Sequence, residues 1–329
     1  MPEYDVLGIG NAIVDVLVHA DDAILEREGM AKGSMQLIDA DVANALYERL
    51  PPGIEMSGGS AGNTMAGIAS LGGRGAYFGK VATDQLGQVF AHDMRSTGID
   101  FRSTPSTSGV TTGRCLILVT ADAQRTMNTY LGASLELAPD DIDPDVVAGA
   151  QVTYLEGYLF DPPLAKEAFT KAARLAHDAG RRVALTLSDS LCVERHRTEF
   201  LELVERHVDI LFANEHEIMS LYRTEHFDDA LQQVRGHCGI AALTRSAKGS
   251  VIVAGDEVHV IDAEPVERVV DTTGAGDLYA AGFLYGLTHG HALATAARMG
   301  SIAAAEVISH VGARPETSLQ VLVEAMLRE

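Results

Sequence analysis

The stretch DTTGAGD, residues 271 to 277, places an aspartate beside three small residues and just before an apolar run with helical spacing. A helix N-terminus presents free N–H groups with a partial positive charge, and Gly274, Ala275 and Gly276 leave those amides open to a phosphate. A carboxylate in that first turn, Asp277, could accept the proton of an attacking hydroxyl. The pattern predicts phosphoryl transfer with Asp277 as general base, and the alternative is an aspartate that only stabilises the helix.

Two other polar groups follow apolar runs that are predicted to be strands. In NEHE, Asn214 and Glu217 lie one helical turn apart and supply the oxygen atoms that Mg²⁺ prefers, the alternative being a helix cap. In TRSAKGS, Thr244, Lys248 and Gly249 stand in a loop where a base or a phosphate could lie, and the alternative is a hairpin turn.

A rival chemistry is indicated by GGSAG, residues 58 to 62, which matches the nucleophile elbow of serine hydrolases with Ser60 as nucleophile. The chain has 12 histidines, so one that could act as the base is available in any case, and the motif alone is weak evidence for a hydrolase. GIGNAI has Ile13 where a dinucleotide fingerprint needs its third glycine, and GGRGAYFGKV lacks two defining residues of a P-loop. If ATP is used, we expect that no P-loop holds it.

The elements that must position these residues follow a regular order. From residue 150 onward, β-branched runs alternate with helical patterns, which predicts a doubly wound, mainly parallel sheet flanked by helices. SGGSAGNTMAGIASLGG is predicted to be a turn and a helix of small residues that another backbone approaches closely, and VERVV, residues 266 to 270, the strand before Asp277. No linker or repeat divides residues 1–329, so we expect one α/β domain.

A small β lid is predicted beside this sheet. Residues 101–131 are rich in Thr, Ser and β-branched side chains, with a turn at residues 121–124, which indicates antiparallel strands joined by hairpins. With the segments 12–19 and 33–38 they are expected to form a discontinuous lid, because they interrupt the βα rhythm.

The composition limits the kinds of molecule that we expect the protein to bind. A net charge of −21 argues against binding to nucleic acid or an anionic membrane, since either needs clustered Lys and Arg. The three cysteines, Cys115, Cys192 and Cys238, are far apart and lack metal-binding spacing, and the N-terminus carries acids rather than the basic region of a signal peptide. We expect a cytoplasmic monomer or homodimer whose partner is a small molecule.

Taken together, DTTGAGD and GGSAGNTMAGIASLGGRGAYFGKVATDQLG resemble the two signatures of the ribokinase (PfkB) family of carbohydrate and nucleoside kinases. The order of the two motifs agrees, and the resemblance covers essentially the whole chain. It implies a ribokinase-like fold with ATP and Mg²⁺ as cofactors, and leaves a monovalent cation such as K⁺ open as an activator. It also implies Asp277 as the base, beside an anion hole formed by Gly274, Ala275 and Gly276.

The family pattern implies roles for residues elsewhere in the chain. Asn214 and Glu217 match its N-x-x-E element for Mg²⁺ and phosphate, while Thr244 and Gly249 match its ATP-side loop. The residues within the motifs that grip sugar hydroxyls are Asn11, Asp15, Gly58, Gly59, Ser60 and Asn63.

Within the family, GNAIVD, GGSAGNT and VDILFANEHE resemble the adenosine kinases more than the ribokinases. Arg125 matches an arginine that closes over the transferring phosphate from the lid, and Gln36 matches a glutamine near the purine. The purine pocket is expected around Leu37, Leu118, Tyr158 and Leu159, while Glu156 in the same region has no predicted role. The resemblance implies ATP-dependent phosphorylation of the 5′-hydroxyl of adenosine, with a ribokinase-like sugar kinase as the alternative.

Overall fold

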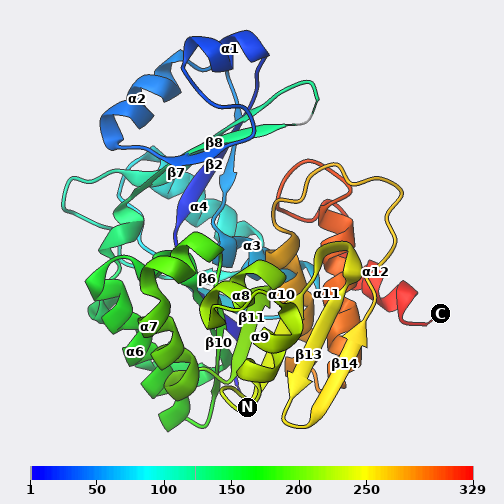
Figure 1. Ribbon diagram of the computed structural model, residues 1–329. Helices are drawn as coiled ribbons and strands as arrows, with labels where there is room; N and C mark the ends of the chain where they lie inside the picture. Colours follow the sequence, from blue (N-terminus) through cyan, green and yellow to red (C-terminus); the bar gives the residue numbers. More distant parts are fainter. Residues whose placement is uncertain (1, 123, 329) are drawn as a thin grey trace.

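The computed structural model describes residues 2–122 and 124–328 and is built around a nine-stranded sheet (Figure 1). In spatial order its strands are β14 (Glu257–Ile261), β13 (Ser250–Ala254), β12 (Ile240–Thr244), β11 (Ile210–Asn214), β10 (Arg182–Thr186), β9 (Ala150–Glu156), β1 (Tyr4–Ile9), β5 (Gly75–Phe78) and β6 (Asp100–Phe101). Neighbours from β12 to β6 pair in parallel, and β13 and β14 add an antiparallel end. The predicted fold class is confirmed.

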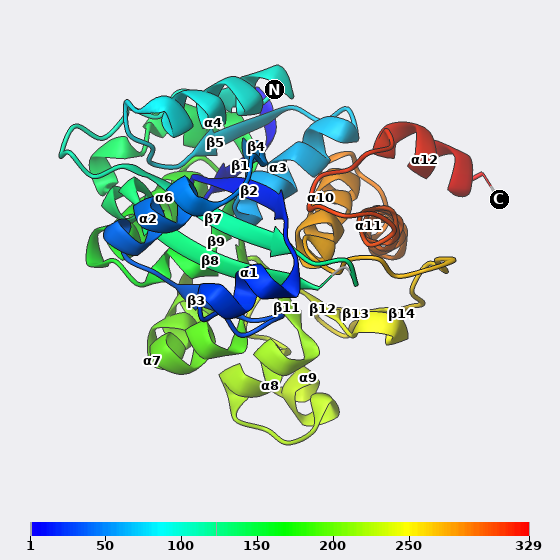
Figure 2. The ribbon, with the colours of Figure 1, turned by 90° about the horizontal axis from the view of Figure 1, so that it is seen from above.

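Helices cover both faces of this sheet, so its central strands are buried on both sides. In β10, Val183 and Leu185 enter one core while Ala184 between them enters the other. The helices of the first core are α5 (Pro144–Gly149), α6 (Pro163–Asp178), α7 (Ser190–His207), α8 (Glu215–Tyr222) and α9 (Phe227–Val234). Those of the second are α3 (Ser60–Ser70), α4 (Gln85–Ser96), α10 (Ala275–Thr288) and α11 (Leu293–Val307), with α12 (Leu319–Met326) packed against α11. Figure 2 shows α8 and α9 across the strands from α10 and α11.

A second sheet of five strands, the small sheet, lies above the edge where the parallel strands end (Figure 1). Its strands in spatial order are β3 (Met35–Leu37), β8 (Arg125–Gly132), β7 (Thr112–Val119), β2 (Ile13–His19) and β4 (Ile54–Ser57). On its outer face Val14, Val16 and Val18 pack with Leu46 of α2 (Ala40–Arg49), and α1 (Asp22–Arg27) lies beside them. The remaining short elements are the 3₁₀ helices η1 (Ala133–Glu136), η2 (Pro139–Asp141), η3 (Gly157–Phe160) and η4 (Ser246–Lys248).

The small sheet differs from the predicted lid in two respects. Residues 102–111 form no strand, and residues 100–101 belong to the large sheet as β6, while β4, which was not predicted, pairs with β2. The β7–β8 hairpin is antiparallel as expected, although residue 123 of its predicted turn lies outside the described residues. Strand β2 runs parallel to β7, so the small sheet is mixed.

The predicted strand at residues 266–270 is wrong. The chain from residue 262 to the start of α10 is irregular, and Val269 is exposed. The backbone N–H groups of Val270 and Asp271 both donate to the carbonyl of Ile308, so they are bound to the α11–α12 connection instead of a strand ladder. β-Branched residues alone do not make a strand where no neighbouring strand is available to pair.

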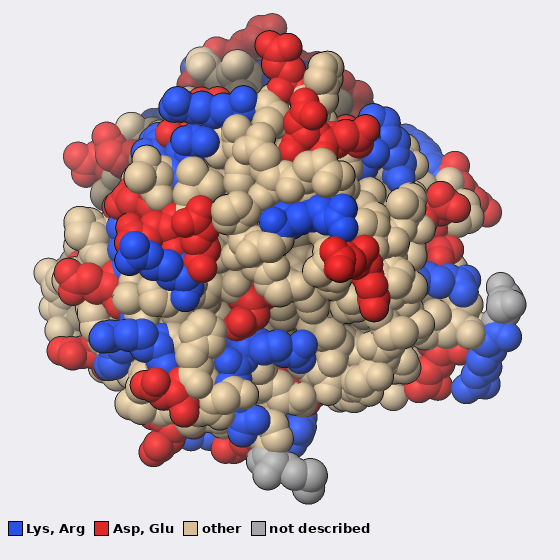
Figure 3. All heavy atoms as spheres, turned by 60° about the horizontal axis from the view of Figure 1, so that its bottom comes forward, with Lys and Arg blue, Asp and Glu red and all other residues tan. Residues whose placement is uncertain are grey.

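Charged side chains of both signs are interspersed on the face of the molecule that Figure 3 presents. Broad single-sign patches, which long-range binding of a polyanion uses, are not visible on that face. Across residues 2–122 and 124–328, none of the helices combines the length and the apolar character needed to cross a membrane.

Candidate active site

Asp277 occupies the first turn of α10, and helix α3 supplies its hydrogen-bond donors. Ser60 Oγ donates to Asp277 Oδ1 over 2.6 Å, and Asn63 Nδ2 donates to Oδ2 over 3.0 Å. The two helices approach closely because α3 carries small residues: a Cβ at Gly67 would lie 2.6 Å from Ala281 Cβ. Burial raises the pKa of Asp277, while the two hydrogen bonds and the charge of Arg314 oppose that rise.

The entrance to α10 is bare backbone, as the sequence predicted. Gly274 has a φ of 79°, and a Cβ there would lie 2.8 Å from Ala313 Cβ, so both its conformation and its surroundings require glycine. Gly276 is exposed, and a Cβ there would meet no heavy atom of the described residues within 4 Å. The amides of the first turn therefore open onto free space in which an anion has room to bind.

The turn before α3 is formed around Asp15 of β2. A Cβ at Gly58 would lie 2.3 Å from Asp15 Cγ, and one at Gly59, whose φ is 84°, would lie 2.3 Å from the carbonyl oxygen of Asn11. Burial raises the pKa of Asp15 to about 6, with Asp277 adding to the rise and Arg314 and Arg125 opposing it. The turn thus packs directly against Asp15, whose charge interacts with that of Asp277.

Asn11 and Glu156 lie behind this turn. Asn11 is 2% exposed; its Nδ2 donates to Glu156 Oε1 over 2.8 Å, and its Oδ1 accepts from Ser134 Oγ over 2.9 Å. The other carboxylate oxygen of Glu156 accepts from the backbone N–H of Ala61 over 2.8 Å. Both ends of the Asn11 amide thus take part in supporting the turn, so its predicted sugar contact stays a prediction. Burial raises the pKa of Glu156 to about 7.

Arg125 and Gln36 belong to the small sheet, whereas Tyr158 follows a strand of the large sheet. Arg125 forms an ion pair with Asp271, 2.5 Å from Nη2 to Oδ2, with both side chains less than a tenth exposed. Gln36 is exposed and its Nε2 donates to Asn128 Oδ1 over 2.6 Å. Tyr158 is partly buried in η3, directly after β9.

Leu118 and Leu159 do not line the site. Asp15 is in register with Cys115 on β7, and Leu118, an odd number of residues further on, points to the opposite face, where it is fully buried. Leu159 is fully buried in the core beneath the large sheet. The residues that share the Asp15 face are instead Ile117 and Val119, which the sequence pattern alone did not identify.

Asn214 and Glu217 form a reciprocal cap at the start of α8. Asn214 Oδ1 accepts from the Glu217 N–H over 2.9 Å, and the Glu217 carboxylate accepts from the N–H and from Nδ2 of Asn214. Glu217 is 5% exposed, and burial raises its pKa to about 7. The helix-cap interpretation is therefore confirmed as a structural fact, and it leaves a buried carboxylate at the carboxyl end of β11.

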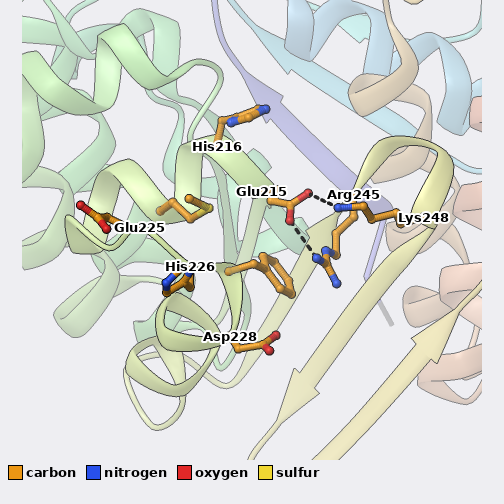
Figure 4. Close-up of a pocket in the computed structure, with 9 residues that line it drawn as sticks. Glu215, His216, Glu225, His226, Asp228, Arg245 and Lys248 are labelled. Carbon is orange, nitrogen blue, oxygen red and sulfur yellow. Dashed lines mark hydrogen bonds and ion pairs between the residues drawn. The ribbon is translucent and has the colours of Figure 1, made fainter.

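The loop that follows β12 is tied to the same helix. Gly249 has a φ of 79° and no room for a Cβ, because one would lie 2.0 Å from the carbonyl oxygen of Ile261. Arg245 and Lys248 both pair with Glu215, at 2.8 and 3.6 Å, around a hollow that Figure 4 shows between this loop, α8 and α9. Thr244 ends β12, directly before Arg245, and is partly buried.

Two important residues were missed by the sequence analysis. Arg314 donates to the backbone on both sides of the Gly58–Gly59 turn, and Asp271 pairs with Arg125. Asp271 lies inside the DTTGAGD motif, which could have drawn attention to it. Arg314 stands alone in a loop, and no residue spacing points to it.

Known proteins are similar to this chain over almost its whole length. The profile of the pfkB family carbohydrate kinases matches residues 53–319. The adenosine kinase of Saccharomyces cerevisiae is 27% identical over 92% of this chain and 94% of its own. The solved structure of adenosine kinase from Sinorhizobium meliloti is 55% identical, with a TM-score of 0.91 over 98% of this chain and 99% of the other. A probable sugar kinase of known structure from Rhizobium etli is 51% identical, with a TM-score of 0.92 over 99% of each chain.

Proposed function

Since this chain belongs to the pfkB carbohydrate kinase family and is a phosphotransferase with an alcohol acceptor, we propose that its acceptor is the 5′-hydroxyl of adenosine. The observation that carries the proposal is the position of Asp277 between the Asp15 turn and the open N-terminus of α10. A hydroxyl held by the turn would reach the base and a phosphate at that N-terminus together.

Unpaired buried polar atoms support a sugar and a phosphate in this site. Among the residues that the structure describes, Asn63 Oδ1 is buried without a hydrogen-bond partner next to Asp277, and a sugar hydroxyl would satisfy it. Within residues 2–122 and 124–328, Arg125 Nε is buried without a hydrogen-bond partner as well, and its Nη2 pairs with the Asp271 carboxylate. A guanidinium in this state suits a phosphate, which accepts two parallel hydrogen bonds.

The donor site is proposed from the groove beside the DTTGAGD loop. A cavity of about 470 Å³ lies between residues 264–270, α11 and α12, and its apolar wall includes Val266, Ile302 and Ala305. A flat nucleobase suits such a slot, and Val270 at its edge leads directly into the loop of Gly274. We place the ATP base in this groove, with its phosphates directed toward α10, Thr244 and Lys248.

The buried carboxylate of Glu217, capped by Asn214, fits Mg²⁺ through its remaining lone pairs or through water. When bound, Mg²⁺ would neutralise charge on the phosphates of ATP. The Arg245–Glu215–Lys248 ion pairs would hold the neighbouring loop in place beside it.

In the proposed mechanism, Asp15 and Asn63 bind ribose hydroxyls and fix the 5′-hydroxyl against Asp277. Asp277 accepts the hydroxyl proton while Ser60 keeps its carboxylate oriented. The amides of the α10 N-terminus and the Arg125 guanidinium stabilise the charge that develops on the transferring group. Arg125 would bring the small sheet over the site as a lid that excludes water.

Adenosine is favoured over a free sugar by the 55% identity to the Sinorhizobium meliloti adenosine kinase. It is also favoured by the apolar side chains that lie on the same face of the small sheet as Asp15. Ile117, Val119 and Met127 continue that face as an apolar cluster beside the exposed Leu37 of the edge strand, with Ile117 and Val119 buried. Apolar side chains at this place suit a purine ring better than a bare sugar, which has no apolar face of that size. A sugar kinase is the second candidate, favoured by the similarity to the Rhizobium etli protein.

The experiment is ADP release from MgATP with adenosine, guanosine, inosine or ribose as acceptor, against a blank without acceptor. Adenosine-dependent release at micromolar concentration, with AMP identified by chromatography, supports the proposal. Turnover of ribose without turnover of adenosine contradicts it and favours the sugar kinase. Asp277→Asn protein serves as the control for a contaminating kinase.

A further inference from the structure

The connection between α11 and α12 contacts both the loop that leads to Asp277 and the turn before α3. The carbonyl of Ile308 accepts from Val270 and Asp271, and the N–H of Gly312 donates to Asp271 Oδ2 over 2.9 Å. Ala313 lies directly against Gly274, at the entrance of α10. Three residues of one short segment thus fix the loop that leads to Asp277.

The next residue, Arg314, reaches across to the turn on the acceptor side. Its Nε and Nη2 donate to the carbonyl of Ser57 over 3.1 and 2.6 Å, and Nη2 also donates to Ser57 Oγ over 2.8 Å. Its Nη1 donates to the carbonyl of Gly62 over 2.9 Å. Since Ser57 ends β4 and Gly62 lies in the first turn of α3, one guanidinium bridges both ends of the glycine turn.

Ser57 is fixed from its other side by Asp93 of α4. Asp93 Oδ2 accepts from the N–H and from Oγ of Ser57, over 2.8 and 2.5 Å. The position of the turn therefore depends on a rigid fork of donors directed at backbone carbonyls. Lysine, a point charge with one nitrogen, cannot reproduce the three separate nitrogen donors.

We propose that Arg314 is a positioning residue that holds the Gly58–Asn63 turn in register with Asp277 for transfer to the acceptor. Through Gly312 and Asp271 it also links this turn to Arg125 of the small sheet. The inference rests on the acceptor site of the proposed function, although not on adenosine as the acceptor.

The positive charge of Arg314 also affects the two carboxyl groups of the site, Asp15 and Asp277. Its guanidinium lowers the pKa of both Asp15 and Asp277, which burial raises. The other titratable or charged groups whose interactions with Asp15 or Asp277 contribute to pKa shifts are Arg125, Cys115, Tyr154, Glu156, Tyr158 and Glu217. Loss of the positive charge should therefore move the protonation of Asp277 to higher pH.

The test compares Arg314→Met, Arg314→Lys and the control Arg206→Met, an exposed arginine of α7, with the acceptor that the wild-type protein turns over. For Arg314→Met we expect the KM for acceptor to rise about 10- to 100-fold, and kcat to fall about 10-fold, with the KM for ATP within about twofold. The acid limb of the kcat/KM profile should move to higher pH. In Arg314→Lys the KM for acceptor should rise while the acid limb stays in place.

Several outcomes would overturn the proposal. One is a folded Arg314→Met protein with the wild-type KM for acceptor and the wild-type acid limb. A loss of active enzyme with unchanged KM points to a purely structural role and also overturns it. If the methionine variant does not fold, an unchanged KM for acceptor in Arg314→Lys is decisive against it.

Failure of the proposed function gives a different result. If the wild-type protein turns over no acceptor, hydrogen exchange of the backbone amides of residues 58–63 still tests the positioning role. Faster exchange of these amides in Arg314→Lys, with unchanged exchange of the amides of α7, supports the positioning role. An unaltered exchange pattern refutes it.

Discussion

The hydroxyl of Ser60 donates a 2.6 Å hydrogen bond to Oδ1 of Asp277, although 217 residues separate them in the chain. This contact joins the two glycine-rich motifs, one in each half of the sequence, into one site. It also decides between two chemistries, because a serine nucleophile needs a base such as histidine on its hydroxyl. Among the described residues Ser60 Oγ is hydrogen-bonded to Asp277 and to no histidine, so the serine hydrolase alternative lacks its base.

Replacing Asp277 with asparagine tests the assignment of the base. Asparagine keeps the shape of the side chain but cannot accept the hydroxyl proton, so kcat should fall by about 10² to 10⁴, equivalent to about 3–5 kcal/mol. Steady-state kinetics with MgATP and the acceptor measure this change. Asp41→Asn, an exposed aspartate in the first turn of α2, is the control and should behave as wild type. Wild-type turnover by Asp277→Asn would exclude the assignment.

Replacing Ser60 with alanine should have a smaller effect. One hydrogen bond to the base is lost, worth about 1–1.5 kcal/mol, so kcat should fall by about 5- to 10-fold. A fluorophosphonate probe, followed by peptide mass spectrometry, should leave Ser60 unlabelled. Ser96→Ala, at the exposed end of α4, is the matched control. An adduct on Ser60 that abolishes activity would restore the hydrolase interpretation.

The fold and the chemistry of the site could be predicted from sequence to different depths. Strands such as β10 were predicted because they are buried on both faces, and the Asp277 turn because small residues beside a carboxylate have few other uses. Leu118 was misplaced because the face that a strand residue occupies depends on register, which β2 sets from a distant part of the chain. Arg314 was missed because its partners are backbone carbonyls, which every residue has and which therefore give no sequence pattern.

Glu217→Gln separates the metal site from the helix cap. If the buried carboxylate supports Mg²⁺, the Mg²⁺ concentration for half-maximal activity should rise by about 10-fold or more. The control is Asp39→Ala, which removes the side-chain cap of α2 and should lower the free energy of unfolding by about 1 kcal/mol without changing the Mg²⁺ dependence. The measurement is a Mg²⁺ titration at saturating ATP and acceptor. An unchanged titration with lowered stability would leave Glu217 as a cap alone.

Glu156→Gln tests the buried carboxyl that supports the turn at Ala61. Burial raises the pKa of Glu156 to about 7 from an ordinary value of 4.5, so the folded protein keeps a proton that the unfolded chain has already lost. The stability that this retained proton gives is present in full below about pH 4.5 and is lost as the pH rises toward 7. Glutamine does not titrate, so the variant does not lose this stability as the pH rises. Between pH 4.5 and 7 the free energy of unfolding of the variant minus that of wild type should therefore increase by about 3 kcal/mol.

Urea unfolding of wild type and Glu156→Gln at several pH values between 4.5 and 7.5 measures the difference between their free energies of unfolding. The contributions of Asp15 and Glu217 to the pH dependence cancel in this difference, because both proteins contain these residues. Glu48→Gln, at an exposed glutamate of α2, is the control for the loss of a surface charge. Parallel stability curves for the wild type and Glu156→Gln would show that the carboxyl titrates alike in the folded and unfolded states. A difference that grows with pH would establish Glu156 as the buried acid that links the protonation of this site to its stability.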